Sequence, residues 1–288
     1  MHSYVPETYE IHINRKELPK GYLKAAYLTD MHNTAGKEET AQILQMLRRE
    51  KPDVIFCGGD MLVARPGVSC RPALDFMREL RTCAPVYMGT GNHEYRLFLY
   101  PETYGDMYEQ YKKKLELTGT DVTTGKKQPE KQDSDSKRYP LYWLENAYRD
   151  AAVNGIPLHI AGYDLDKKYY KRLSREKLPK PEIQEAVGKP KRNAVNILLA
   201  HNPFYLRTYQ AWGADLSLSG HYHGGVMRLG QHHGVISPDF HLFTPIAHGL
   251  FVRNGRNALV SSGCGEHTIP VRINNPREIV FLNLYVNQ

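Results

Sequence analysis

The fold is decided by three stretches near the start of the chain, LKAAYLTD (23–30), PDVIFCGGD (52–60) and APVYMGTGNH (84–93). Each is a short apolar run that ends in glycine or in residues that commonly bind metal ions. Runs of this length and composition are typical of buried parallel strands. The intervening segments 37–51 and 71–80 carry apolar residues at helical spacing. The first third of the chain therefore predicts a β-α-β-α-β unit.

The second half of the chain repeats this pattern. NAVNILLAHNP (193–203), ADLSLSGHYH (214–223) and NALVSSGCG (257–265) are again apolar runs that end in His or Gly. Two sheets built from such strands bury their faces against one another and against flanking helices. We expect an α/β fold, a four-layer α/β/β/α sandwich with mixed sheets, in which the carboxyl ends of the strands meet in one cleft.

The chain has 288 residues, of which 41% are hydrophobic and 24% are charged. These values are typical of a folded, soluble protein, and we expect one domain over 1–288. Residues 118–140 are polar and charged with almost no apolar side chains, which predicts a flexible insertion. The lysine-rich segment 166–192 is a candidate cap over the site, although a solvated helical or loop face is the simpler interpretation of such a charge run.

Composition also bears on location and partners. No run approaches the roughly 18 to 20 apolar residues that a bilayer crossing requires, and residues 1–20 lack the apolar centre of an export signal. The four cysteines form no CxxC pair, which fits a reducing cytoplasm. The net charge of +7 favours anionic partners. We expect a cytoplasmic protein whose contact with acidic membranes is peripheral and weak; the oligomeric state stays open.

The strand ends carry five blocks of metal-ligand residues. In order they are Asp30-Met31-His32, Gly59-Asp60, Gly91-Asn92-His93-Glu94, His201-Asn202-Pro203 and Gly220-His221-Tyr222-His223. Carboxylate and amide oxygens mixed with imidazole nitrogens suit Mn, Fe, Zn or Ni, whereas Ca or Mg sites consist almost entirely of oxygen. Residues i and i+2 of an extended segment point to the same side, so the ligands of DxH and HxH can converge on neighbouring ions. A single histidine would more often be structural, but five ordered blocks are specific.

The order DxH, GDxx, GNH(D/E), H and GHxH resembles the calcineurin-like metallophosphoesterase superfamily from about Leu23 to the end of the chain. The segments GHYHGGVMRLG (220–230) and SSGCGEHTIPVR (261–272) are similar to a small bacterial phosphodiesterase-like subgroup. This subgroup includes UDP-2,3-diacylglucosamine hydrolase-like enzymes. Many of its members carry an amino-terminal membrane or export segment, for which this chain shows no signal, so substrate and location do not transfer directly.

The resemblance implies a site with two divalent transition-metal ions that share a hydroxide, which attacks phosphorus in line. One ion would be bound by Asp30, His32 and His223, the other by Asn92, His201 and His221, and Asp60 would bridge them. His93 would be the catalytic residue outside the ligand set, and would stabilise the transition state or protonate the leaving oxygen. Asn33 and Arg272 are candidates for substrate contact, although a turn and a salt bridge are their simpler interpretations.

One departure from the family pattern concerns His93. Protein serine/threonine phosphatases of the superfamily carry GDxVDRG, whereas this chain has GDMLVAR (59–65), so Val63 stands where a second Asp would orient the ring of His93. The phosphoprotein phosphatase interpretation loses support, and a different group must hold this ring.

The sequence thus favours a hydrolase of a small-molecule phosphoester, with a phosphodiester or pyrophosphate bond in a nucleotide or lipid conjugate as the first choice. A phosphomonoesterase is the alternative within the same chemistry. A nuclease or nucleic-acid-binding protein that uses the same metal site is also left open and is disfavoured. A metal-binding scaffold without activity would be expected to lack a ligand, and all seven ligand positions are filled.

Overall fold

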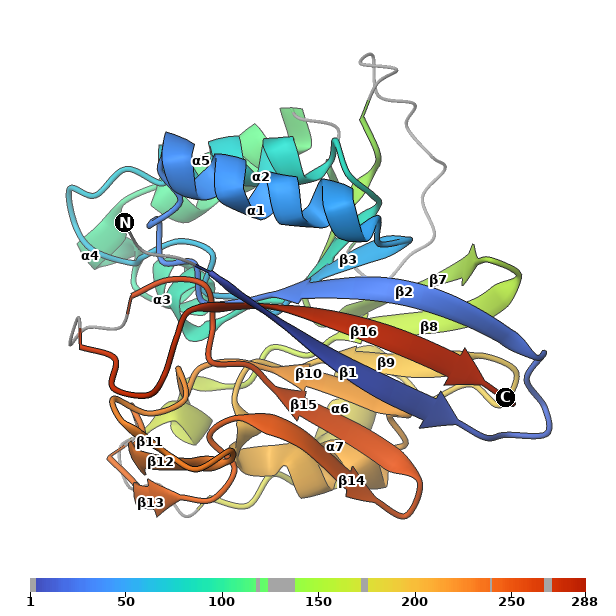
Figure 1. Ribbon diagram of the computed structural model, residues 1–288. Helices are drawn as coiled ribbons and strands as arrows, with labels where there is room; N and C mark the ends of the chain where they lie inside the picture. Colours follow the sequence, from blue (N-terminus) through green and yellow to red (C-terminus); the bar gives the residue numbers. More distant parts are fainter. Residues whose placement is uncertain (1–3, 118–119, 124–137, 172–175, 239, 267–270) are drawn as a thin grey trace.

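Two β-sheets pack face to face at the centre of the molecule, and helices cover the outer face of each sheet (Figure 1). The computed structural model describes residues 4–117, 120–123, 138–171, 176–238, 240–266 and 271–288. The layers follow in the order helices, sheet, sheet, helices. This arrangement confirms the predicted α/β/β/α sandwich with mixed sheets.

The first sheet has the strand order β1-β16-β2-β3-β4-β6-β5. Its strands are β1 (Val5–Ile13), β2 (Gly21–Leu28), β3 (Val54–Cys57), β4 (Val86–Met88), β5 (Thr120–Thr123), β6 (Leu141–Leu144) and β16 (Glu278–Val286). β2, β3 and β4 pair in parallel, as the β-α-β-α-β unit predicts, and β6 pairs in parallel with β4. β16 lies between β1 and β2, parallel to the former and antiparallel to the latter.

The second sheet has the order β14-β15-β10-β9-β8-β7, and a small third sheet has the order β11-β12-β13. The strands of the second sheet are β7 (Ala147–Val153), β8 (Ile156–Gly162), β9 (Val195–Leu199), β10 (Leu216–Ser219), β14 (Gly249–Arg253) and β15 (Arg256–Val260). Those of the third are β11 (Arg228–Leu229), β12 (His233–Ile236) and β13 (Leu242–Thr244). The third sheet projects at the lower left of Figure 1, away from the helices of the first sheet.

The helices complete the outer layers. α1 (Lys37–Glu50), α2 (Arg71–Leu80) and α5 (Met107–Leu117) cover the first sheet, and α6 (Lys180–Val187) and α7 (Leu206–Trp212) cover the second (Figure 1). The connections contain α3 (Asn92–Leu99), α4 (Pro101–Tyr104) and the 3-10 helices η1 (Lys167–Tyr170) and η2 (Pro203–Tyr205). None of the helices formed by the described residues has both the length and the apolar character needed to cross a bilayer.

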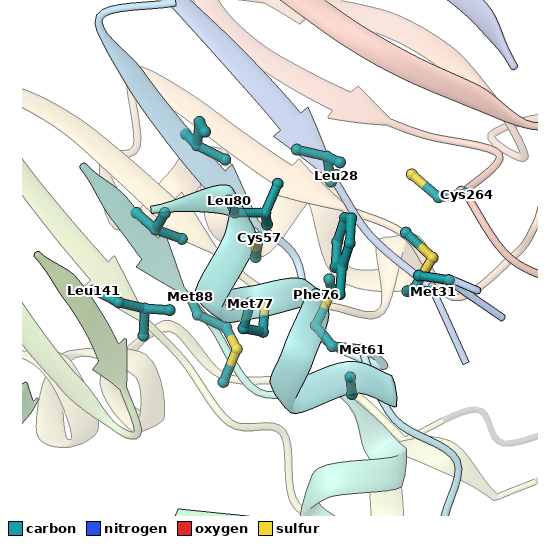
Figure 2. Packing of buried hydrophobic residues seen from close by; sticks show 14 of the residues in the cluster. Leu28, Met31, Cys57, Met61, Phe76, Met77, Leu80, Met88, Leu141 and Cys264 are labelled. Carbon is teal, nitrogen blue, oxygen red and sulfur yellow. The ribbon is translucent and has the colours of Figure 1, made fainter. Parts of the chain in front are cut away.

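Alternating side chains of the central strands fill two different cores, because successive residues of a strand point to opposite faces. On β2, Leu23, Ala25 and Tyr27 lie between the two sheets, whereas Ala26 and Leu28 face the helices. Figure 2 shows the core between the first sheet and its helices, in which residues of α2 pack against the strand residues Leu28, Cys57 and Met88. Because both faces of these strands are buried, their sequences are continuous apolar runs.

The structure describes parts of the two segments that were predicted to be an insertion and a cap. Of the predicted insertion 118–140, residues 120–123 form the edge strand β5 beside β6, since an edge strand needs backbone partners on one side only; 118–119 and 124–137 lie outside the described residues. In the predicted cap 166–192, Tyr169 and Ile183 are buried in the core under the second sheet. Lysines such as Lys167 and Lys180 stay exposed, so much of this segment belongs to the outer helical layer.

The substitution Phe281→Ala tests the position of β16. We expect it to lower the free energy of unfolding by about 3–5 kcal/mol, because Phe281 is fully buried between the first sheet and its helices. The control Val252→Ala, on β14 and 63% exposed, should change that free energy by less than about 0.5 kcal/mol. Urea unfolding followed by circular dichroism measures both. Equal effects of the two substitutions would contradict the central place of β16.

Candidate metal centre

The residues predicted to bind metal meet at the carboxyl ends of strands from both sheets. Three overlapping groups of side chains each bring their donor atoms within 4.8 Å of one another: Asp30, His32 and His223; His32, Asp60 and His93; and Asp60, His201 and His221. We use the name donor cluster for the seven residues Asp30, His32, Asp60, Asn92, His201, His221 and His223. β2, β3 and β4 of the first sheet precede the first four, and β9 and β10 of the second sheet precede the other three.

Asp30, His32 and His223 surround the first candidate position for a cation. Nε2 of His32 and Nε2 of His223 are 3.2 Å apart, and Nε2 of His223 is 3.3 Å from Oδ1 of Asp30. Two nitrogens bound to one ion in tetrahedral geometry, each at about 2.0–2.1 Å, would be about 3.4 Å apart. The observed spacing therefore fits three donors that share one cation.

The second candidate position lies beside Asp60. Nε2 of His201 is 3.1 Å from Oδ2 of Asp60, and the rings of His201 and His221 are 5.3 Å apart. Nδ1 of His201 lies 2.8 Å from the carbonyl oxygen of Gly58, so a proton on Nδ1 makes this hydrogen bond and leaves Nε2 with a free lone pair. Oδ1 of Asn92 is buried and has no hydrogen-bond partner among the described residues. An orphaned amide oxygen at this place fits a cation ligand.

The buried charges of the cluster depend on one another. Burial alone would raise the pKa of the Asp30 carboxyl, but the imidazoles of His223 and His201 hold it below its usual range. Asp60 is likewise buried, and His201 and His93 keep its pKa well below the ordinary value. Burial opposes the charged form of His201, yet Asp60 and Asp30 raise its pKa to about 10. The extra proton on His201 thus neutralises part of the negative charge of Asp30 and Asp60. A metal cation bound between them would neutralise this charge more fully.

The backbone of the donor cluster is strained. Five of its seven residues have a positive φ, between 48° and 64°: Asp30, His32, Asp60, His221 and His223. This conformation costs roughly 1–2 kcal/mol for a residue other than glycine. Gly59 has φ 94°, and a Cβ at this position would lie 2.3 Å from the backbone nitrogen of Gly91. Only glycine therefore fits where the loops after β3 and β4 touch.

Contacts between loops and with the core hold this strained backbone in place. The N–H of Asp30 donates to the carbonyl oxygen of Gly59, and the N–H of His32 donates to that of Asp60. Met31 and Met61, each next to an aspartate of the cluster, are fully buried in the core under the helices; Figure 2 shows both side chains. Each loop thus presents donors on one side and an apolar anchor on the other.

Glu94 is a residue of the site whose role the sequence analysis did not identify. Its side chain is fully buried. Oε2 accepts hydrogen bonds from the N–H groups of Asp60 and Gly91, at 2.8 and 3.0 Å, and Oε1 accepts from Met61 at 2.8 Å. A carboxylate that accepts several backbone N–H groups stabilises the loop that makes them available. The acid at the end of the GNHE block was visible in the sequence, but two of its partners, Asp60 and Met61, lie 34 and 33 residues earlier.

The group that orients His93 is the backbone of the segment that lacks the second aspartate. The N–H of Ala64, next to Val63, donates to Nδ1 of His93 at 2.9 Å. An imidazole that accepts at Nδ1 carries its proton on Nε2 and is neutral. Burial acts in the same direction, because it lowers the pKa of His93 to about 3. The ring stands at right angles to that of His32, 4.8 Å away.

The two predicted substrate residues lie at the edge of the cluster. Nδ2 of Asn33 donates to the carbonyl oxygen of Ser69 at 3.1 Å. Nη2 of Arg272 donates to the carbonyl oxygens of Ser262 and Gly265, at 2.9 and 2.6 Å. The same Nη2 is 3.4 Å from Nδ1 of His223, a contact too long to set the tautomer of that ring. Nε of Arg272 is buried without a hydrogen-bond partner in the described part of the chain.

Comparisons with known proteins identify the family of the chain. The model of the calcineurin-like phosphoesterase family matches residues 23–225, and the chain belongs to this family. It is 27% identical over 270 residues to an uncharacterized metallophosphoesterase of Helicobacter pylori, covering 91% of this chain and 60% of the relative.

Two further proteins are similar over most of the chain. A transmembrane protein with metallophosphoesterase domain from Bos taurus is 26% identical over 283 residues, 96% of this chain and 56% of the relative. The solved structure of TT1561 of Thermus thermophilus has a TM-score of 0.45 and 9% identity, with 84% of this chain and 90% of that chain covered. The chain thus spans 60% of the length of the Helicobacter pylori relative and 56% of the length of the Bos taurus relative.

The role of Glu94 can be tested by Glu94→Gln, which keeps the shape but places N–H donors against backbone N–H groups. We expect a loss of about 2–4 kcal/mol in the free energy of unfolding, measured by urea titration of the metal-free protein. Glu102→Gln on α4, at an exposed position, is the matched control and should cost less than about 0.5 kcal/mol. If Glu94→Gln were as stable as this control, the carboxylate would not be what holds the loop after β3.

The raised pKa of His201 predicts how metal binding depends on pH. Below pH about 10 both ring nitrogens of His201 carry a proton in the metal-free protein, and the proton on Nε2 must leave before this atom can bind an ion. The apparent affinity for Mn²⁺ should therefore rise with pH, by up to about tenfold per unit between about pH 7 and pH 9. Calorimetry in two buffers of different ionisation enthalpy measures the affinity and the protons released. An affinity that stays constant over this range would contradict the expected proton displacement.

Proposed function

We propose that the protein is a metal-dependent phosphoesterase that hydrolyses a phosphodiester or pyrophosphate bond of a small molecule, such as a nucleotide or lipid conjugate. The observation that carries the proposal is the convergence of two sets of oxygen and nitrogen donors on the buried carboxylate of Asp60. Membership of the phosphoesterase family supports the reaction class. The mixed donors favour Mn, Fe, Zn or Ni over Ca or Mg.

We assign two divalent ions to the donor cluster, with Asp60 between them. Asp30, His32 and His223 would hold one ion, and Asn92, His201 and His221 the other, in agreement with the spacing of the donor atoms. When bound, the two ions supply a hydroxide nucleophile at neutral pH and draw charge from the phosphoryl oxygens. The protein contributes a rigid frame, because backbone N–H groups bind the carboxylates of Asp30 and Asp60.

His93 would act as a hydrogen-bond donor to the phosphoryl group. Its Nδ1 accepts a hydrogen bond from the N–H of Ala64, so Nε2 carries the proton. The Nε2–H group can therefore donate a hydrogen bond to a phosphoryl or leaving oxygen. A neutral imidazole is a poor source of a whole proton, because loss of Nε2–H would leave an imidazolate. Of the two roles expected from the sequence, stabilisation of transition-state charge is therefore the better supported.

The choice of a diester or pyrophosphate substrate rests on the similarity of segments 220–230 and 261–272 to the phosphodiesterase-like subgroup, which includes UDP-2,3-diacylglucosamine hydrolase-like enzymes. Arg272 lies in the second of these segments, and its buried Nε–H has no hydrogen-bond partner among the described residues. Guanidinium N–H groups are strong donors to phosphate oxygens. Asn33 is the weaker candidate, since its amide nitrogen already donates to Ser69. Phosphomonoesters and nucleic acids are the competing substrates.

The test compares bis-p-nitrophenyl phosphate with p-nitrophenyl phosphate on metal-stripped protein with and without added Mn²⁺. We expect Mn²⁺-dependent cleavage of the diester. Asp60→Asn should lower kcat by at least about 10³-fold because the shared carboxylate is lost. His93→Ala should lower kcat by about 10²–10³-fold while Mn²⁺ affinity is kept.

His233→Ala, an exposed histidine, is the control for both variants and should retain full activity. Circular dichroism checks that each variant is folded. Full activity in Asp60→Asn would refute the assigned site. Cleavage of the monoester alone would favour a phosphomonoesterase, and salt-sensitive binding of short DNA or RNA would favour the nucleic-acid alternative.

A further inference from the structure

The loop that begins at His223 has an unusual backbone. His223, Gly224 and Gly225 have consecutive positive φ values of 48°, 68° and 72°. This conformation is unfavourable at a residue other than glycine, so His223 keeps it only where its surroundings hold the loop. Nε2 of His223 lies 3.2 Å from Nε2 of His32 and 3.3 Å from Oδ1 of Asp30. Relaxation of the loop would therefore take a donor away from the first candidate position.

The side-chain amide of Asn275 holds this loop. Its Nδ2 donates to the carbonyl oxygens of His223 and Gly225, at 2.5 and 2.6 Å, and the residue is 2% exposed. Two carbonyl oxygens need N–H donors, so the nitrogen of the amide rather than its oxygen faces the loop. One side chain thus fixes the carbonyl groups on both sides of Gly224.

Gly224 and Asn275 are complementary in shape. A Cβ at position 224 would lie 2.2 Å from Oδ1 of Asn275, so only glycine lets the amide come this close. This contact accounts for the glycine that directly follows His223. Oδ1 itself is buried and has no hydrogen-bond partner among the described residues. An unsatisfied buried acceptor costs stability, so what Asn275 contributes lies in its two bonds to the loop.

The segment that carries Asn275 connects the two sheets. Two backbone hydrogen bonds of Ile273 join it to the loop after His223, and it leads directly into β16 of the first sheet. His223 itself follows β10 of the second sheet. Asn275 thus fixes a donor of the second sheet relative to the sheet that carries Asp30 and His32.

Residues that hold a metal ligand in place commonly change the metal affinity by about 10–100-fold when they are replaced. Arg272 contributes less to the position of His223, because its Nη2 is 3.4 Å from Nδ1 of the ring. We infer that Asn275 is a positioning residue for the first ion: it fixes His223 and thereby sets the affinity of the first candidate position. The inference rests on the metal site of the proposed function.

The experiment titrates metal-stripped protein with Mn²⁺ in a calorimeter. The wild type should show two binding events, as the proposed site requires. Asn275→Ala should weaken one of them by about 10–100-fold and leave the other unchanged. Asn14→Ala, at an exposed position, is the matched control and should bind Mn²⁺ as the wild type does. Circular dichroism checks folding, and Asn275→Ser, which should show the same selective loss, serves if Asn275→Ala does not fold.

A double-mutant cycle shows whether Asn275 acts through His223. In the background of His223→Ala, the further change Asn275→Ala should alter Mn²⁺ affinity by less than about twofold, because the amide then has no donor to position. Electron paramagnetic resonance with two equivalents of Mn²⁺ gives a spectroscopic readout. The wild type should show the signal of a coupled pair, and Asn275→Ala mainly that of uncoupled Mn²⁺. Additive losses in the cycle, or a coupled pair in Asn275→Ala, would overturn the inference.

The outcomes separate this inference from the proposed function. Mn²⁺-dependent hydrolysis of the diester together with identical Mn²⁺ binding by the wild type and Asn275→Ala would overturn the role of Asn275 alone. A selective loss of Mn²⁺ binding in Asn275→Ala, in a protein that hydrolyses neither p-nitrophenyl ester, would support that role and refute the proposed function. A wild-type protein that binds no Mn²⁺ would overturn both.

Discussion

Two buried carboxylates at the junction of the sheets determine how the rest of the site is built. Asp30 follows a strand of the first sheet and accepts the N–H of His221, which follows a strand of the second. In the other direction, His201 of the second sheet is tied to the carbonyl of Gly58 in the first. The groups offered to a cation are therefore the same groups that join the sheets. Without positive charge between them, the carboxylates would repel one another at the centre of the molecule.

This arrangement places strain and function at the same residues. Positive φ at five of the seven donors is costly for each. In the loop after β3, Glu94 binds the N–H groups of Asp60 and Met61, and Met31 and Met61 anchor the loops after β2 and β3 in the core. The short turns bring donors from separate strands within a few ångström. A relaxed backbone would have stabilised the metal-free chain and separated the donors.

The sequence was most informative where structure and chemistry are both local. Apolar runs that end in Asp, Asn or His predicted β2, β3, β4, β9 and β10 and the donors behind them, because burial on both faces leaves a continuous signal. β1 and β16 were not predicted as a pair, since Val5 pairs with Glu278 across most of the chain and β1 is only partly buried. The hydrogen-bond partner of His93 could not be predicted either, because the donor is the backbone N–H of Ala64 and every residue except proline has such a group. The small third sheet, with strands as short as two residues, has no periodicity to detect.

The position of β16 has a consequence for synthesis of the chain. The ribosome delivers Glu278–Val286 after every other strand of the first sheet, yet this strand lies inside that sheet with β1 on one side and β2 on the other. A nascent chain that stops short of it holds two strands without their shared neighbour, with unpaired edges open to other chains. The first sheet can close only after residues 278–286 have been made. A polypeptide truncated before β16 would thus be a target for chaperones and proteases rather than a partly active protein.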